Sequence, residues 1–438
     1  MIEEREIKFL NPSSAGYRFL ILLFVAFLAY GSYFAYDSLG AIAPLLIKAL
    51  GIGREQIGIA YSAYSIAAIF SVFLGGLLVD RIGTRKASLL FSSLIVFGAF
   101  IVAVAGNIYT IYIGRVIFGI GSESLVVCQS AILARWFKGK ELALAFGISL
   151  TLSRLGTILS FNIEASIAEK FGSFRSALWA AFLFCVFSLL ANLAYYFLDS
   201  FGSKVLKLRE ASSEEKIRLE EIKELPSSYW MAVFLCLTFY SAIFPFTSLS
   251  TDFFNSKWGI PLSLQEGGSG LISSIINFFK GIFKTAGGIT SIIMIASAIF
   301  APIFGRMVDK IGKRVSILIL GSAMMIPTYI LMGFTNIYPA FPMIFLGISF
   351  SLVPSALWPS VPLIVREEKV GTAFGLMTMI QNIGLFLFPY LNGKLRDLTN
   401  GYTASMVMFT ILGLLGFTFS ILLKISDRKM GNLLEKGK

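Results

Sequence analysis

Long apolar stretches recur along this chain and constrain its fold more than any other feature. A helix needs about 20 residues to cross the roughly 30 Å hydrocarbon core of a bilayer. Because lipid offers no hydrogen-bond partners to the backbone, segments of this kind are expected to be helical. We therefore predict an all-α membrane protein with twelve transmembrane helices. Their expected ranges are 17–39, 57–79, 87–106, 108–134, 141–167, 174–198, 228–253, 286–304, 316–334, 337–363, 371–393 and 403–424.

Composition argues against a soluble protein, an enzyme and a nucleic-acid-binding protein. Of 438 residues, 56% are hydrophobic and 14% are charged, and the mean hydropathy is +0.79. The net charge of +12 comes from basic residues spread over several short loops, which favours contact with anionic lipid over nucleic acid. The sequence shows no metal-ligand cluster, nucleophile–base set or phosphate-binding loop. We expect no cofactor, no metal site and no catalytic residues.

The loops divide the chain into two halves with a defined orientation. Most of the 37 Lys and Arg residues lie on one side if both termini are cytoplasmic, as the positive-inside rule requires. The charged segment 200–227 interrupts the apolar pattern and is predicted to be a cytoplasmic linker. It separates an N-terminal six-helix bundle, 1–199, from a C-terminal one, 228–438. A further segment, 264–285, either forms an interfacial helix on the outer side or extends a neighbouring span.

One loop motif occurs in each half. GGLLVDRIGTRK (75–86) follows the second span and FGRMVDKIGKR (304–314) follows the eighth, and this recurrence indicates an internal duplication. We expect a glycine of each copy to permit close helix contact, the aspartate to meet a helix N-terminus or an Arg, and the basic residues to hold the turn at the membrane surface. The motif has a structural or gating role, carried by Gly76, Asp80, Arg81, Gly83 and Arg85 and by Gly305, Asp309, Lys310, Gly312 and Arg314.

The duplicated loop resembles the signature loop of the major facilitator superfamily, whose members move small solutes by rocking two halves about a central site. Further stretches resemble one branch of it, the dipeptide uniporters of animal lysosomes known as major facilitator superfamily domain-containing protein one: GSYFAYD (31–37), GRVIFGIGSESL (114–125), SRLG (153–156), ALWPS (356–360) and QNIGL (381–385). The resemblance implies uniport of dipeptides by alternating access. It also implies a cell membrane location in a microbe, or a lysosomal membrane and a glycosylated accessory membrane protein in a eukaryote.

Two opposite charges are predicted to lie at the same depth near the middle of the membrane. Glu123 and Arg154 are equally far from the cytoplasmic ends of the fourth and fifth spans, about 20 Å in at 1.5 Å per residue. One interpretation is a buried salt bridge that fixes helix packing. The other, which the family resemblance supports, is that Glu123 binds the ammonium group of a dipeptide and Arg154 its carboxylate.

Other polar groups inside the spans are weaker candidates. Arg115 and Glu164 repeat the matched-depth geometry nearer the outer surface, where we expect a structural or gating ion pair. Asp37 on the first span either lines the cavity or caps the outer end of its helix. In the second half, four amphipathic or polar residues lie inside spans, and each could serve either in helix packing or in substrate contact. As a group they are predicted to contact the substrate opposite Glu123 and Arg154, and they are Tyr240, Trp358, Gln381 and Asn382.

Two other functions fit parts of the sequence. The first is a proton-coupled transporter of another small organic solute, a drug or an organic anion, on the same fold. Antiporters of that kind usually carry a Gly-Pro-rich signature in the fifth span, whereas ALAFGISLTLSRLGTILS contains no Pro. The second is a membrane receptor or scaffold that moves nothing. It would be expected to carry a large soluble domain or a long tail, which this sequence lacks.

Overall fold

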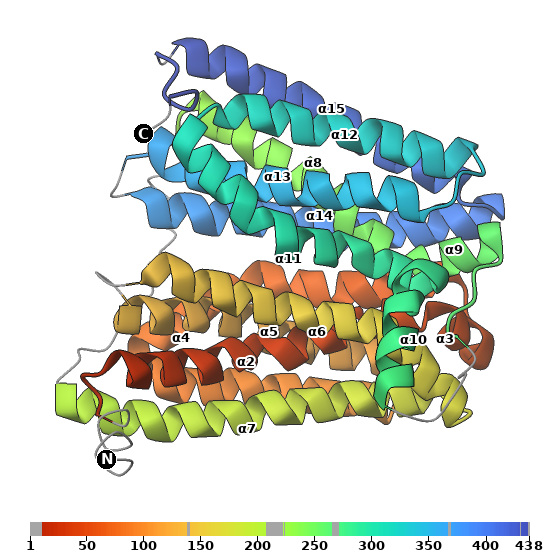
Figure 1. The fold of residues 1–438 in the computed structure, drawn as a ribbon, viewed down its shortest axis with the longest axis horizontal. Coiled ribbons are helices and arrows are strands. Elements are labelled where there is room, and N and C mark those ends of the chain that lie inside the picture. Colours follow the sequence, from red (N-terminus) through yellow and green to blue (C-terminus); the bar gives the residue numbers. More distant parts are fainter. Residues whose placement is uncertain are drawn as a thin grey trace.

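The computed structural model describes residues 11–137, 141–206, 222, 224–264, 271–366, 369–429 and 431–436. Within these ranges all regular secondary structure is helical (Figure 1). Most of the predicted linker lies outside the described residues. Within its described part, Glu224 forms an ion pair with the Lys369 ammonium.

The first half consists of α2 (Ala15–Ala41), α3 (Ala43–Leu50), α4 (Arg54–Ala103), α5 (Ile108–Phe137), α6 (Leu142–Lys170) and α7 (Phe174–Leu206). At 50 residues, α4 is about 75 Å long at 1.5 Å per residue, enough for two crossings. Its backbone leaves the helical region at Gly83, where φ is +78°. The chain turns back there. Tyr112, near the start of α5, donates to the carbonyl of Gln56 at the start of α4, so the end of α4 lies close to its beginning.

The second half consists of α8 (Ser227–Thr247), α9 (Ser250–Trp258), α10 (Leu271–Lys284), α11 (Ala286–Ile311), α12 (Arg314–Phe334), α13 (Ala340–Ile364), α14 (Val370–Thr399) and α15 (Thr403–Lys429). Among the described residues, eleven helices are long and apolar enough to cross a membrane. Since α4 holds two spans, the twelve predicted spans are confirmed. The prediction for 228–253 was wrong at its end, because the helix stops at Thr247 and a separate α9 follows.

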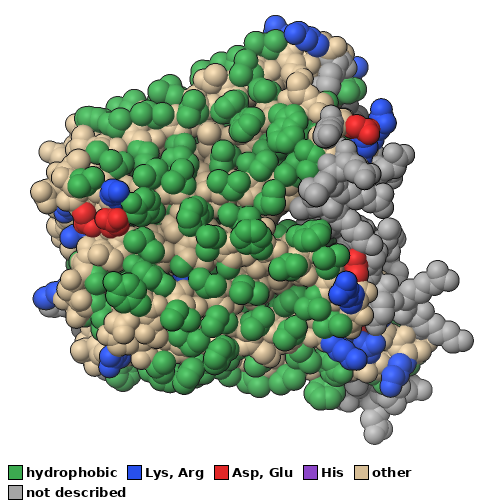
Figure 2. Space-filling view, turned by 180° about the vertical axis from the view of Figure 1, so that it is seen from behind, with side chains coloured by type: hydrophobic (Ala, Val, Ile, Leu, Met, Phe, Trp, Pro, Cys, Tyr) green, Lys and Arg blue, Asp and Glu red, His purple; other side chains and the backbone are tan. Residues whose placement is uncertain are grey.

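The long helices form two bundles that lie side by side with their axes roughly parallel, α2 and α4–α7 below and α8 and α11–α15 above in Figure 1. The start of α2 and the end of α15 lie at one end of the molecule, here called the terminal end, and α3, α9 and α10 lie at the opposite, distal end. Hydrophobic side chains cover the flank of both bundles, and charged ones gather toward the two ends (Figure 2). This is the surface expected of a protein surrounded by lipid.

Helix α10 runs across the distal ends of the spans rather than along them (Figure 1). Ile276, Phe279 and Phe283 are all exposed on it, next to Lys280 and Lys284. It extends neither neighbouring span, because α8 has ended at Thr247 and Thr285 caps the start of α11. An amphipathic helix in this position favours the interfacial interpretation. Residues 265–270 lie outside the described part of the chain.

The first loop motif joins three helices through one buried carboxylate. Asp199 of α7 is fully buried and accepts hydrogen bonds from Trp136 Nε1 at 2.6 Å and Arg135 Nη1 at 3.1 Å. Arg85 of the motif lies 3.4 Å from the same carboxylate, just beyond the turn at Gly83. Asp80 and Arg81 are exposed. The sequence analysis had identified Arg85 but not its partner Asp199.

The second copy differs. Gly312 turns the chain with φ of +71°, and Arg314 lies 3.8 Å from Asp309. Lys310 is exposed. The expected close helix contact at Gly305 was wrong, because a Cβ atom there would meet open space. In the first copy Gly75, next to Gly76, does pack closely, against Ser124 of α5.

This contrast predicts different effects of two aspartate substitutions. Asp199→Ala leaves Arg135 buried without its counter-charge and should destabilise the protein by about 3–5 kcal/mol. Asp309→Ala removes a carboxylate whose side chain is 68% exposed and should change stability by less than about 1 kcal/mol. Thermal unfolding of the purified variants in detergent would measure both. Equal melting temperatures would contradict the assignment of Asp199 as the buried junction.

Candidate substrate-binding site

Glu123 of α5 lies beside a group of hydroxyls near the middle of its span. The side chain is half-buried, and its Oε1 accepts a hydrogen bond of 2.6 Å from Tyr64 Oη of α4. The Tyr64 hydroxyl is also 3.2 Å from Ser122 Oγ, which is 2.8 Å from Ser32 Oγ of α2. These contacts connect three helices of the first half, and no ion pair to Glu123 is found among the described residues.

Arg154 of α6 reaches the second half of the molecule. Its Nη1 lies 3.4 Å from Met294 Sδ of α11, and its guanidinium lies 4.9 Å from the centre of the Phe350 ring of α13. Its Nε is buried and has no hydrogen-bond partner. A guanidinium carries five N–H donors, so Arg154 keeps most of its capacity unused at the boundary between the halves.

Tyr33 connects the two charges. Glu123 and Arg154 form no ion pair with each other, and Tyr33 of α2 lies close to both. Tyr240 of α8 lies close to Arg154 and Tyr33 in turn, and it accepts a 2.9 Å hydrogen bond from Trp358 Nε1 of α13. The structure therefore brings together three residues that the sequence analysis had selected, Arg154, Tyr240 and Trp358. Glu123 is related to them only through Tyr33.

Three neighbours of this site were missed from sequence. Tyr33 lies within the stretch GSYFAYD but was not selected as a site residue, and Met294 and Phe350 look like ordinary apolar residues. Their spacing places them on long apolar runs that give no sign of which face meets Arg154. To predict these contacts from sequence, one would have to know how α11 and α13 are oriented about their own axes.

The remaining candidates in the second half lie farther from the charges or are satisfied locally. The Gln381 side-chain oxygen is 3.5 Å from Cys236 Sγ, which connects α14 to α8. Asn382 is buried and donates to the carbonyl of Thr378 within its own helix at 3.1 Å. No described contact joins either residue to Glu123 or Arg154, so their substrate contacts stay predictions.

Arg115 and Glu164 do not pair in this conformation. Arg115 is buried, donates to the carbonyls of Ala35 and Tyr36 at 3.4 and 3.2 Å, and is surrounded by four aromatic rings 4.8–5.6 Å away: Tyr36, Tyr61, Tyr64 and Phe118. Glu164 is fully buried, and neither carboxyl oxygen has a hydrogen-bond partner. Asp37 is also buried, at 4% exposure, and lies near Thr157 and Arg115. An Arg115–Glu164 pair in another conformation stays a prediction.

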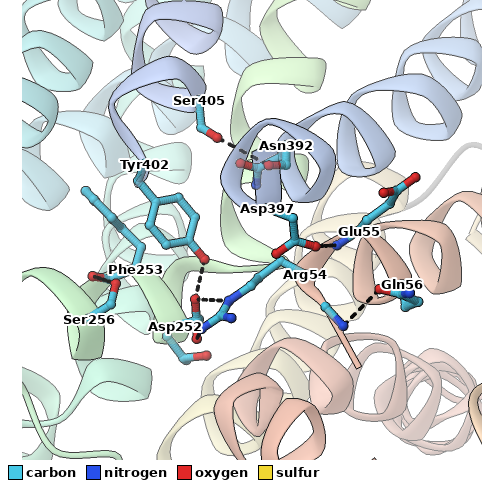
Figure 3. Close-up of polar contacts among 12 residues, drawn as sticks. Arg54, Glu55, Gln56, Asp252, Phe253, Ser256, Asn392, Asp397, Tyr402 and Ser405 are labelled. Atoms are coloured by element: carbon cyan, nitrogen blue, oxygen red, sulfur yellow. Dashed lines mark hydrogen bonds and ion pairs between the residues drawn. The ribbon is translucent and has the colours of Figure 1, made fainter. Parts of the chain in front are cut away.

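An ion pair joins the two halves at the distal end (Figure 3). Arg54, at the start of α4, donates through Nε and Nη2 to the two carboxylate oxygens of Asp252 on α9, at 3.0 and 3.1 Å. Tyr402 Oη donates to the same carboxylate at 2.6 Å. Asp252 is 4% exposed. Two-pronged geometry and burial make this a strong contact of its kind.

Backbone contacts continue the same seam, here called the distal seam. The Asp397 carboxylate of α14 accepts from the N–H of Glu55 at 2.8 Å, which satisfies a free donor of the first turn of α4 (Figure 3). Gly58 packs against the carbonyl of Pro389, with no room for a Cβ atom. The distal seam also includes contacts between α6 and α11, where Asn162 donates to Ser291 Oγ at 2.9 Å. The described polar contacts between the halves thus gather toward the distal end.

Two six-helix groups of spans, a closed distal end and unpaired charges at the boundary between the halves define a membrane transporter. The model of the Major Facilitator Superfamily matches residues 22–283 and 263–438. The chain therefore belongs to the Major Facilitator Superfamily.

Comparison with individual proteins shows which members of the family this chain is similar to. It is 31% identical over 434 residues to the lysosomal dipeptide transporter MFSD1 of Homo sapiens, covering 96% of this chain and 89% of the relative. It is 33% identical over 430 residues to the MFSD1 of Danio rerio, covering 95% and 88%. Among solved structures, a peptide transporter, POT, matches with a TM-score of 0.71 at 15% identity, covering 94% and 95%. These relatives and neighbours are transporters and not enzymes, as predicted for this chain.

The distal seam predicts the effect of breaking its ion pair. Arg54→Gln removes a charge-assisted contact of about 1.5–3 kcal/mol, so the balance should move toward a distally open form by roughly ten- to a hundredfold. Ser248→Cys reports on opening, because Ser248 is buried and its carbonyl lies against Gly40 across the seam. A membrane-impermeant maleimide should label this cysteine faster in the Arg54 variant.

Two controls make that result specific. The native cysteines Cys128, Cys185 and Cys236 are buried, so the chain without Ser248→Cys gives the background. Arg175→Gln removes an exposed distal cation that contacts only its own half in the described structure, and it should leave labelling unchanged. Equal labelling in the Arg54 and Arg175 variants would contradict the role of the pair.

Proposed function

We propose that this protein transports dipeptides across a membrane by alternating access, as a uniporter. The observation that carries the proposal is the state of Glu123 and Arg154. Both are half-buried near mid-span, and neither neutralises the other. An ionised side chain at the bilayer centre costs roughly 2.5–3.5 kcal/mol on insertion scales, so an unpaired one requires water or a charged ligand.

A dipeptide supplies both missing partners in one molecule. Its ammonium group donates to the Glu123 carboxylate, and its carboxylate accepts from the unused N–H groups of Arg154. Tyr33 lies near both charges, and we expect it to contact the peptide bond. Tyr240 and Trp358 offer apolar surface on the opposite half. The relatives named for dipeptide transport support the substrate class.

Alternation follows from where the contacts lie. The described polar contacts hold the halves together at the distal end, and Figure 2 shows a gap between them toward the terminal end. We propose that residues 1–199 and 228–438 move as the two units, with 200–227 as their linker. The terminal end, with both termini, is assigned to the cytoplasm. Location in a lysosomal membrane or in a cell membrane, and a glycosylated accessory protein, stay predictions.

If Glu123 binds the ammonium group, the effect of a Glu123 variant should depend on whether the substrate has that group. Glu123→Gln keeps the size of the side chain and loses its charge, so a free dipeptide should bind roughly ten- to a hundredfold more weakly, a loss of about 1.5–3 kcal/mol. An N-acetylated dipeptide has no ammonium group. It should be a poor substrate for the unmodified protein and should lose little more with the variant. Uptake into liposomes that contain the purified protein measures both.

Packing effects need a separate control. Tyr64→Phe removes the 2.6 Å hydrogen bond to Glu123 but keeps the carboxylate, so it should preserve the preference for the free dipeptide. Arg154→Lys keeps the charge and loses the planar donor set, and should weaken dipeptides with a free carboxylate more than their amides. Equal losses for free and acetylated dipeptides, together with a lower melting temperature, would show that Glu123 acts in packing.

A further inference from the structure

Three ionisable groups lie together behind the distal seam of the first half. Arg115 of α5 is 2% exposed, Asp37 of α2 is 4% exposed and Glu164 of α6 is fully buried. Asp37 lies near Arg115 and Thr157, and Glu164 lies near Asp37. The cluster therefore holds one cation that is always charged and two carboxyl groups.

The surroundings of Glu164 provide nothing to stabilise a negative charge. Neither of its oxygens has a hydrogen-bond partner. The ionisable groups that face it or Asp37 are Cys185 of α7, Tyr33 and Tyr36 of α2, and Tyr61 of α4. In their neutral forms none of these supplies a positive charge. Asp37, in contrast, has both Thr157 and the positive charge of Arg115.

Charge balance then requires one proton. Burying an isolated carboxylate is so unfavourable that the group takes up a proton instead, and the charge on Asp37 would further oppose a second anion beside it. Asp37 is the carboxylate that Arg115 compensates. Glu164 is the carboxyl group that must be neutral in this conformation.

The position of Glu164 indicates from which side this proton comes. Phe161 and Asn162, on the same helix, contact Gly287 and Ser291 of α11 across the distal seam. Closing the seam therefore covers the segment that carries Glu164. The described structure buries this carboxyl completely while the distal end is closed, so the proton exchanges when that end is open.

We propose that Glu164 is a proton-binding site that is loaded from the distal side and must be occupied before the distal end closes. The proton binds to the Glu164 carboxylate, gives a neutral carboxylic acid, and leaves again to the same side when the seam opens. No proton crosses the membrane in this scheme, so it remains compatible with uniport. It rests on the proposed alternation between a distally open and a distally closed form.

Acidification of the distal compartment should consequently favour closure. If Glu164 is ionised in the open form and protonated in the closed form, the closed-to-open ratio changes by up to about tenfold per pH unit. The chain contains no His, so the side chain that ordinarily titrates between pH 5 and 8 is absent. Other described carboxylates at the seam, those of Asp252, Asp397, Glu55 and Glu169, have charged, hydroxyl or backbone partners there or remain at least partly exposed.

Distances between spin labels test the inference without requiring transport. Labels at Lys48→Cys on α3 and Ile337→Cys between α12 and α13 are exposed and lie on opposite halves at the distal end. In lipid nanodiscs, the short-distance population should grow from pH 8 to pH 5. Glu164→Gln mimics the neutral acid, so it should show a large short-distance population that does not change with pH. Glu164→Leu, which is also neutral, should behave in the same way.

Controls separate this inference from the proposed function. Glu141→Gln changes an exposed glutamate at the terminal end, next to the start of α6, and should keep the pH response. A pH response that persists in both Glu164 variants would overturn the proton site. A single distance at every pH and with every dipeptide would instead overturn alternation itself. Dipeptide-driven proton movement into liposomes that disappears in Glu164→Gln would show that the proton crosses, which contradicts release to the distal side.

Discussion

The free energy of placing charge in a low-dielectric interior governs how this protein is arranged. Each ionised group far from water has to be compensated, and the structure does this in different ways. Asp199 is held by Arg135, Arg85 and Trp136 at the terminal end. Arg115 lies among backbone carbonyls and aromatic rings. Where compensation is incomplete, as at Arg154, the side chain lies at the boundary between the halves, and it is there that a charged solute would complete it.

The same constraint ties binding to movement. Arg154 belongs to the first half but contacts Met294 and Phe350 of the second, so under the proposed alternation its environment would change when the halves separate. The Arg54–Asp252 pair likewise joins the two halves, and the proposed opening of the distal end would break it. Ligand binding and distal closure would thus depend on the same kind of interaction, a charge-assisted contact across the boundary between the halves. A ligand that supplies such a partner alters the balance between the two conformations.

Sequence predicted the spans well because hydrocarbon thickness and helical rise fix their lengths. It also predicted similar depths for Glu123 and Arg154, since the rise per residue sets depth, and both side chains are half-buried near mid-span; their common binding role stays a prediction. The same reasoning about Arg115 and Glu164 produced no pair in this conformation, because depth does not specify the direction in which a side chain points around its helix. Arg54 and Asp252 were missed for another reason. They are 198 positions apart at helix ends, where charged residues are common and carry no signal of their own.

The distal seam is built largely from atoms that every amino acid possesses. Gly58 meets the carbonyl of Pro389, Gly393 that of Arg54 and Gly287 that of Phe161, in each case with no space for a Cβ atom. Such an interface depends on side chains that are missing more than on side chains that are present. Mutations at different positions of the seam should therefore have unequal effects. Exchanges among larger residues nearby leave the backbone contacts intact. A single methyl group at one of these glycines would instead push the halves apart. A comprehensive substitution scan would reveal the seam as isolated intolerant positions within permissive helices.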